Sequence, residues 1–142
     1  MSEEWEAIVL LSDAAQVAEG KLYVLGGGWS LTGPGPFLHA LAIRLMVPWT
    51  QTNRQHAVEA SLRDEDGGPV LTGDPPQEIG FQSRVEVGRP PGIPAGTPLE
   101  VPIAINFGPL DLPASSGFTW VIRVDGEEVT RANFRTRSNI GT

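Results

Sequence analysis

The chain has 142 residues, the length of one domain with a single hydrophobic core. Its 40% hydrophobic and 19% charged residues exclude a disordered chain. The lack of cysteine excludes disulfides, thiolate metal sites and cysteine nucleophiles, and a net charge of -7 with ten scattered basic residues argues against a nucleic-acid partner.

The N-terminal segment predicts neither secretion nor a membrane anchor. It reads MSEEWEAIVLLSD, which opens with acidic residues and has only a short apolar run, unlike a signal peptide. No stretch approaches the roughly 20 apolar residues of a membrane helix. We therefore expect a cytoplasmic protein without a membrane partner, folded as one domain over residues 1–142 with a flexible tail at 136–142.

The first elements in chain order are two evenly apolar runs, residues 6–12 and 21–25, which predict buried strands. Between them lies DAAQVAEG, which predicts a single helical turn with Asp13 as its N-cap.

Three consecutive glycines follow in VLGGGWSL, residues 24–31. A phosphate-binding glycine loop leads from a strand into a helix, but the GPGP at 33–36 excludes a helix here. The glycines instead predict a bulge or sharp bend in one long strand that passes from one sheet to the other.

The rest of the chain alternates apolar and polar residues with a period of two, typical of strands buried on one face. The alternating segments are residues 37–49, 55–64, 79–87, 99–107 and 117–136. Pro102 places its strand at a sheet edge, because proline cannot donate to a ladder, and Asp125-Gly126 predicts a tight hairpin turn. The pattern predicts an all-β fold, an antiparallel two-sheet β-sandwich of about eight or nine strands.

The two histidines, His39 and His56, fall in the inward phase of their strands. No GxSxG, HExxH or Walker-type lysine motif accompanies them, and two histidines alone make a poor zinc site. We expect packed histidines, no catalytic residue and no cofactor. A hydrolase assembled around either ring would require a nucleophile within hydrogen-bond reach.

The acidic run Asp64–Asp66 is the best metal candidate, with Asp64 and Asp66 as calcium ligands. Its spacing departs from an EF-hand loop, and Gly67 and Gly68 favour a hairpin turn with solvated charges.

Trp29 and Trp49 lie at strand ends, where they would either plug the core or anchor a partner. Arg131, Arg135 and Arg137 suit an anionic partner, or form the charged outer face of a strand.

Several stretches together resemble a family of small uncharacterised bacterial proteins, a domain of unknown function. They are DAAQVAEGKLYVLGGGWSL, VPW, LRDEDGGPV and SGFTWVIRVDGEEVTRANFR, and they span nearly the whole chain. The resemblance implies a β-sandwich and no established activity. The last hairpin is similar to the final strands of immunoglobulin-like modules, although both cysteines are missing and Phe118 stands where a tyrosine corner is expected.

The sequence thus favours a non-enzymatic, immunoglobulin-like module that binds a protein partner or itself. Trp29, Trp49 and the edge strand around Pro102 are its candidate interaction residues. The alternative is a small-molecule or calcium-binding sandwich that uses the Asp64–Asp66 loop.

Overall fold

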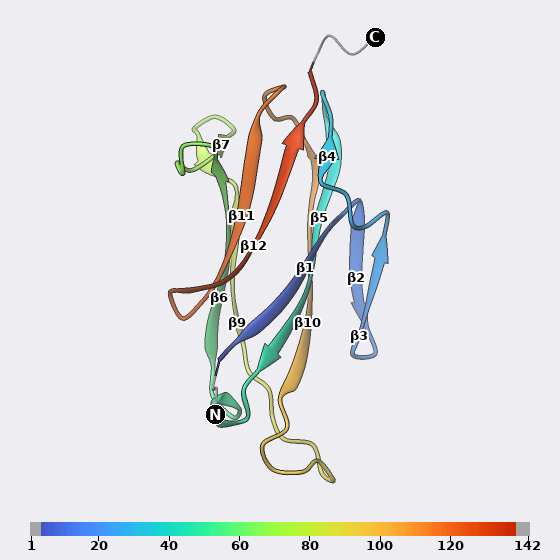
Figure 1. Cartoon of the computed structure of the whole chain (residues 1–142), viewed down its shortest axis with the longest axis vertical. Helices are drawn as coiled ribbons and strands as arrows, with labels where there is room; N and C mark the ends of the chain where they lie inside the picture. The colour runs from blue at the N-terminus through green and yellow to red at the C-terminus, as the bar shows by residue number, and fades with distance from the viewer. Residues whose placement is uncertain (1–3, 139–142) are drawn as a thin grey trace.

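The computed structural model describes residues 4–138, which form an all-β fold with one short 3-10 helix, η1 (Trp49–Gln51) (Figure 1). The strands of this part of the chain are β1 (Glu6–Ser12), β2 (Ala14–Ala18), β3 (Lys21–Leu25), β4 (Leu31–Thr32), β5 (Phe37–Val47), β6 (His56–Asp64), β7 (Leu71–Thr72), β8 (Gln77–Glu78), β9 (Gly80–Val85), β10 (Leu99–Leu110), β11 (Gly117–Val124) and β12 (Glu127–Thr136).

These strands form four sheets, none of them closed. One has three strands in the order β1-β5-β10, one has five in the order β4-β12-β11-β6-β9, and β2-β3 and β7-β8 are two-stranded. Twelve strands are thus found among the described residues, where the sequence predicted eight or nine; the short strands in loops were missed. The purely antiparallel prediction is wrong at β4, which runs parallel to β12.

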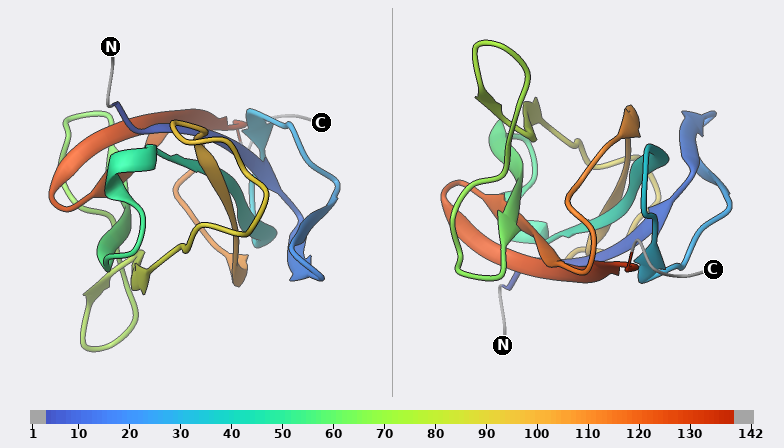
Figure 2. Two further views of the ribbon diagram at one scale, coloured as in Figure 1. Left: turned by 90° about the horizontal axis from the view of Figure 1, so that it is seen from below. Right: turned by 90° about the horizontal axis from the view of Figure 1, so that it is seen from above.

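The main core lies between the three-stranded and the five-stranded sheet, whose strands are seen end-on in Figure 2. One side of each strand faces this core because successive side chains alternate between the faces of a sheet. Fully buried side chains from both sheets meet there: Leu41, Ile43, Leu62, Trp120, Ile122 and Phe134. The inward phases predicted from period two are therefore confirmed.

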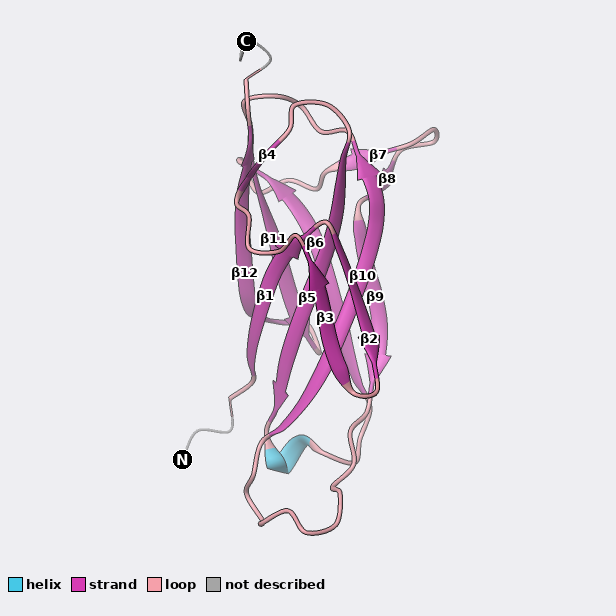
Figure 3. Cartoon of the chain, turned by 90° about the vertical axis from the view of Figure 1, so that its right-hand side faces the viewer, coloured by secondary structure: helices cyan, strands magenta, loops and turns pink. Residues whose placement is uncertain are grey.

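The β2-β3 hairpin covers the outer face of the three-stranded sheet (Figure 3). Ala15 of β2 packs against Ala40 and Ala42 of β5, and these small side chains allow the two layers to approach closely. Asn106 of β10 fixes the hairpin by donating from Nδ2 to the Ala15 carbonyl at 2.8 Å and accepting the Ala15 N–H at 3.1 Å. As a result β5 is buried on both of its faces.

The prediction of a helical turn at DAAQVAEG is wrong, because this segment contains β2. Glu19 and Gly20 both have positive φ, 53° and 71°, and form the two-residue turn that joins β2 to β3. A turn of this conformation favours a hairpin. The backbone of β2 can then pair with β3, whereas a single helical turn would have no such partner strand.

Residues 26–28 lie in the connection between β3 and β4. They follow a strand and do not form a bulge or bend within one, so the prediction of a bulge is wrong. The predicted passage between sheets is confirmed, since β3 belongs to the hairpin and β4 to the five-stranded sheet. The Gly28 N–H donates to the Leu11 carbonyl at 2.8 Å, which holds this connection against the end of β1.

Three other predictions concern the C-terminal half. The Asp125-Gly126 turn is confirmed, with positive φ at both residues, and Pro102 lies on β10, an edge strand. Thr136, placed in a tail by the sequence, ends β12 and is buried; residues 139–142 of that tail lie outside the described residues. Within residues 4–138, no helix has the length and apolarity needed to cross a membrane.

Candidate functional site

The acidic segment Asp64–Asp66, hereafter the acidic turn, begins at Asp64, the last residue of β6. Asp64 Oδ1 accepts the backbone N–H groups of Asp66 and Gly68, both at 2.9 Å. This carboxylate therefore closes a turn, as its glycines favoured. In the part of the chain that the structure describes, no three His, Asp or Glu side chains are placed to hold a metal ion together.

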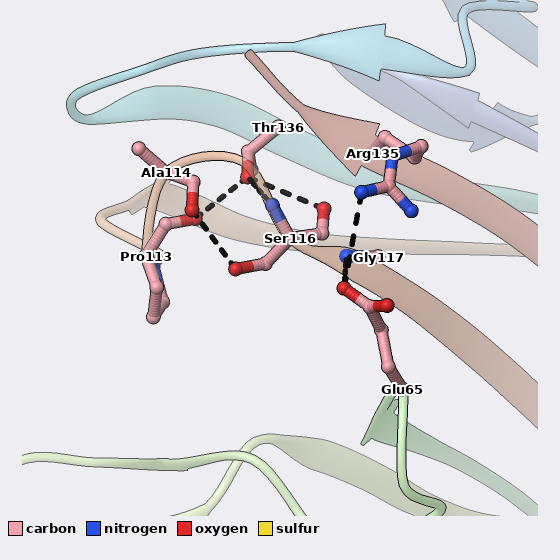
Figure 4. A network of polar contacts seen from close by, with 7 residues as sticks. All are labelled: Glu65, Pro113, Ala114, Ser116, Gly117, Arg135 and Thr136. Atoms are coloured by element: carbon pink, nitrogen blue, oxygen red, sulfur yellow. Dashed lines mark hydrogen bonds and ion pairs between the residues drawn. The ribbon is translucent and has the colours of Figure 1, made fainter. Parts of the chain in front are cut away.

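The polar contacts in Figure 4 connect the acidic turn to the ends of β11 and β12. Glu65 Oε1 accepts the Gly117 N–H at 2.6 Å and lies 3.9 Å from Arg135 Nη2. Beside them, Thr136 Oγ1 accepts the Ser116 N–H at 3.1 Å. The acidic turn is thus part of the structure at this end of the five-stranded sheet.

Trp29 and Trp49 both make their main contacts within the protein. The Trp29 ring lies edge-on to His39 and Phe134, with ring centroids 5.3 and 5.8 Å apart. The Arg89 guanidinium lies 3.9 Å from the centre of the Trp49 ring and donates to the Trp49 carbonyl at 2.8 Å. The sequence left open whether these rings plug the core or anchor a partner. The geometry favours plugging for Trp29, and the Trp49 ring is covered by Arg89.

His39 is buried among aromatic rings, and its Nε2 accepts the indole N–H of Trp120 at 2.7 Å. Since an indole can only donate, the proton of the neutral ring sits on Nδ1, which has no hydrogen-bond partner among the described residues. The Trp29 indole N–H, on a neighbouring ring, has none either. Burial lowers the pKa of His39 to about 4.

His56 lies at the opposite end of the fold. Its Nδ1 is hydrogen-bonded to Asp125 Oδ2 and its Nε2 to the Gln51 carbonyl, both at 2.7 Å. The Trp5 ring packs edge-on against it, with centroids 4.7 Å apart. The hydrogen bond from His56 lowers the pKa of Asp125. Both ring nitrogens are thus occupied by acceptors, and neither bonds a hydroxyl nucleophile.

The largest group of exposed apolar side chains lies on β1 and the β2-β3 hairpin. Ala15 faces the sheet, so the alternate positions of the hairpin face outward, among them Tyr23 (51% exposed) and Leu25 (70% exposed). Ile8 and Leu10 lie on the outer face of β1, 54% and 41% exposed. We call Ile8, Leu10, Tyr23 and Leu25 the hairpin face.

The predicted arginines are divided between two places. Arg131 and Arg135 lie on the outer face of the five-stranded sheet, as their register opposite Val121 and Gly117 shows, and Arg137 follows the end of β12. Arg131 binds Glu128 through two hydrogen bonds of 2.6 and 3.0 Å. Arg131 and Arg135 therefore form the charged outer strand face that the sequence predicted.

A family model described as a family of unknown function, DUF6941, matches residues 7–137. The chain belongs to this family. No curated protein and no solved structure matches the DUF6941 chain.

Sequence reasoning missed the hairpin face of this DUF6941 protein because DAAQVAEG was assigned to a helical turn. The signal for the hairpin was Glu19-Gly20, a two-residue turn between apolar runs. Asn106 was missed as well, and its local sequence contains no indication that its side chain would bond β2.

Proposed function

We propose that the protein is a non-enzymatic, immunoglobulin-like β-sandwich module that binds protein, either a second copy or a partner, through the hairpin face. The two-sheet sandwich is supported by the position of the main core between the three- and five-stranded sheets. The two-stranded hairpins β2-β3 and β7-β8 are additions to that sandwich.

The observation that carries the binding proposal is the concentration of exposed apolar side chains on one side of the molecule. Among the described residues, six of the nine large apolar side chains classed as exposed lie on the first three strands. Two of them, Val17 and Val24, point to the sheet side of the hairpin, and the other four are Ile8, Leu10, Tyr23 and Leu25 of the hairpin face. Exposed apolar patches of this kind mark association surfaces, and a tyrosine is a frequent anchor in them.

The test compares the wild type with a Tyr23→Ser/Leu25→Ser variant by sedimentation equilibrium and native mass spectrometry. We expect self-association over roughly 1 µM to 1 mM, the range of weak protein complexes, and a loss of about tenfold or more in the variant. Leu71→Ser is the matched control, because Leu71 is as exposed as Ile8 but lies on β7.

Failure of the proposal has a defined form. If the wild type stays monomeric over this range and cross-linking in lysate joins no protein to the hairpin face, the module does not work by protein binding through this surface. If Leu71→Ser weakens association as much as the double variant does, the hairpin face is not the interface.

The alternative function, calcium or small-molecule binding at Asp64 and Asp66, has a separate test. A ligand that binds the folded state must raise its thermal stability. A rise in Tm with millimolar calcium that Asp66→Asn abolishes would favour this alternative over protein binding.

A further inference from the structure

A second surface, on the outer face of the five-stranded sheet, gathers arginines from three strands. Arg63 of β6, Arg123 of β11, and Arg131 and Arg135 of β12 share this face, as the register of the three strands shows. We call these four residues the arginine face. Arg63, Arg123 and Arg131 line a shallow hollow of about 640 Å³, together with Val121 and the acidic residues Asp64 and Glu65.

The floor of this hollow is apolar although it lies on the outer side of the sheet. Val121 points outward, opposite Arg131 and Ser61, yet it is only 3% exposed. The long stems of neighbouring arginines shield such a side chain while their guanidinium groups stay in water. The hollow thus combines a desolvated centre with a charged rim in which three arginines outnumber the two carboxylates, an arrangement that resembles the anatomy of a binding hot spot.

The arginine face contrasts with the chain as a whole, which has a net charge of -7 and only ten basic residues. Arg63 makes no side-chain hydrogen bond or ion pair within residues 4–138, and Arg123 donates only to Ser61 Oγ, at 3.4 Å. The Arg63 guanidinium therefore remains available to an external acceptor, whereas Arg123 lies opposite Glu128 and is attracted by its carboxylate.

The partners already present indicate which acceptor these arginines take. At the rim, Arg131 binds the Glu128 carboxylate and Arg135 lies 3.9 Å from the Glu65 carboxylate. A guanidinium fork pairs with a carboxylate through two parallel hydrogen bonds.

The spacing of the arginines selects an extended ligand. Arg131 and Arg135 are four residues apart on one strand, about 13 Å, and Arg63 lies two strands away from β12, about 10 Å. These backbone spacings place the four arginines in an array that spans three strands. Alternate residues of an extended peptide lie about 7 Å apart on one side of it, which suits several carboxylates bound in a row.

We propose that the arginine face binds an extended, carboxylate-rich segment of another protein. This is a second surface, separate from the hairpin face, and it recognises its partner by charge. Electrostatic complementarity of this kind steers association and weakens with salt.

The test measures fluorescence anisotropy of a labelled peptide of roughly ten alternating Glu and Thr residues, extended enough to cross the face. We expect saturable binding to the full chain that weakens severalfold between about 50 and 300 mM salt. An Arg63→Gln/Arg123→Gln variant should bind about tenfold more weakly. Arg44→Gln is the matched control, since Arg44 lies on the other sheet and pairs with Glu100.

Several results would overturn the proposal. They are no binding at low salt, equal binding of a Lys-Thr peptide, equal weakening by Arg44→Gln, and preferential displacement of the peptide by single-stranded DNA. Unchanged self-association of the Arg63→Gln/Arg123→Gln variant supports a partner segment as the occupant, whereas its loss would assign the face to a second copy. If the Tyr23→Ser/Leu25→Ser variant still binds the peptide, the arginine face binds independently of the hairpin face.

Discussion

The buried ring of His39 makes the stability of this protein depend on pH. Its Nε2 accepts the indole N–H of Trp120 at 2.7 Å, so a second ring proton would place two N–H donors against each other. Burial lowers the pKa of His39 from its ordinary 6.5 to about 4. Between these two pH values the unfolded state binds more protons than the folded state, and acid therefore favours unfolding.

The size of the effect follows from the two pKa values. The stability contributed by the neutral ring is fully present above pH 6.5 and is lost as the pH falls towards 4. At about 1.4 kcal/mol for each pH unit between the folded and the unfolded pKa, the free energy of unfolding falls by about 3 kcal/mol across this window.

The assay compares urea unfolding of the wild type and His39→Gln from about pH 7.5 to about pH 4.5, followed by tryptophan fluorescence. Glutamine offers Trp120 an amide oxygen but does not titrate. At the upper pH the variant should be less stable by about 1 to 3 kcal/mol because the core is perturbed. At the lower pH the difference in unfolding free energy should have shifted by roughly 2 to 3 kcal/mol in favour of the variant. Only the wild type loses stability because a buried histidine resists protonation.

Two results would refute this reasoning. One is a gap between the two proteins that stays constant over the whole pH range. The other is a His39 ring resonance that titrates close to pH 6.5 in the folded protein, as an exposed histidine does.

The remaining predictions concern polar contacts. Asp125→Asn should lower the free energy of unfolding at pH 7 by about 1 kcal/mol or less, because the buried His56 ring loses a carboxylate partner that is itself half exposed to solvent. Since the pKa of Asp125 is lowered, urea titrations should show this difference vanishing as the pH falls below 3.8 and through the lowered value. Asp64→Ala should destabilise by about 1 to 2 kcal/mol in urea, because two turn N–H groups lose their acceptor, and equal stability would contradict this role. Asn106→Ala should speed amide hydrogen exchange in β2 and β3 before any other strand, and unchanged exchange there would show that this side chain does not hold the hairpin.

The long strands could be predicted because successive side chains of a strand point to opposite faces of the sheet, and this determines both the apolar period and the burial. From Phe37 to Val47 the odd positions face the main core, and the sequence alternates accordingly. The Asp125-Gly126 turn could be predicted as well, because its conformation is determined by two adjacent residues. The edge position of Pro102 follows from one missing N–H donor.

The surfaces proposed for binding could not be predicted, since each depends on contacts between distant segments. The even positions of β5, such as Ala40 and Ala42, are buried only because the hairpin covers them. Arg63 and Arg131 are far apart in the sequence and share a face only because β11 pairs with both of their strands. The tryptophans were misleading for the same reason: Trp49 stands at a strand end, but distant Arg89 covers its ring.

The three glycines that follow β3 determine where the hairpin face lies. A Cβ at Gly27 would lie 2.5 Å from Cγ1 of Val24, and one at Gly26 would lie 2.5 Å from the Asp13 carboxylate. Gly26 and Gly28 also have positive φ, 62° and 90°, so side chains in this connection would either strain its backbone or collide with Val24 and Asp13. Since a two-stranded hairpin has little stability of its own, it depends on this close approach and on Asn106. The segment that looked like a phosphate loop thus helps to fix the position of Tyr23 and Leu25 in the proposed hairpin face.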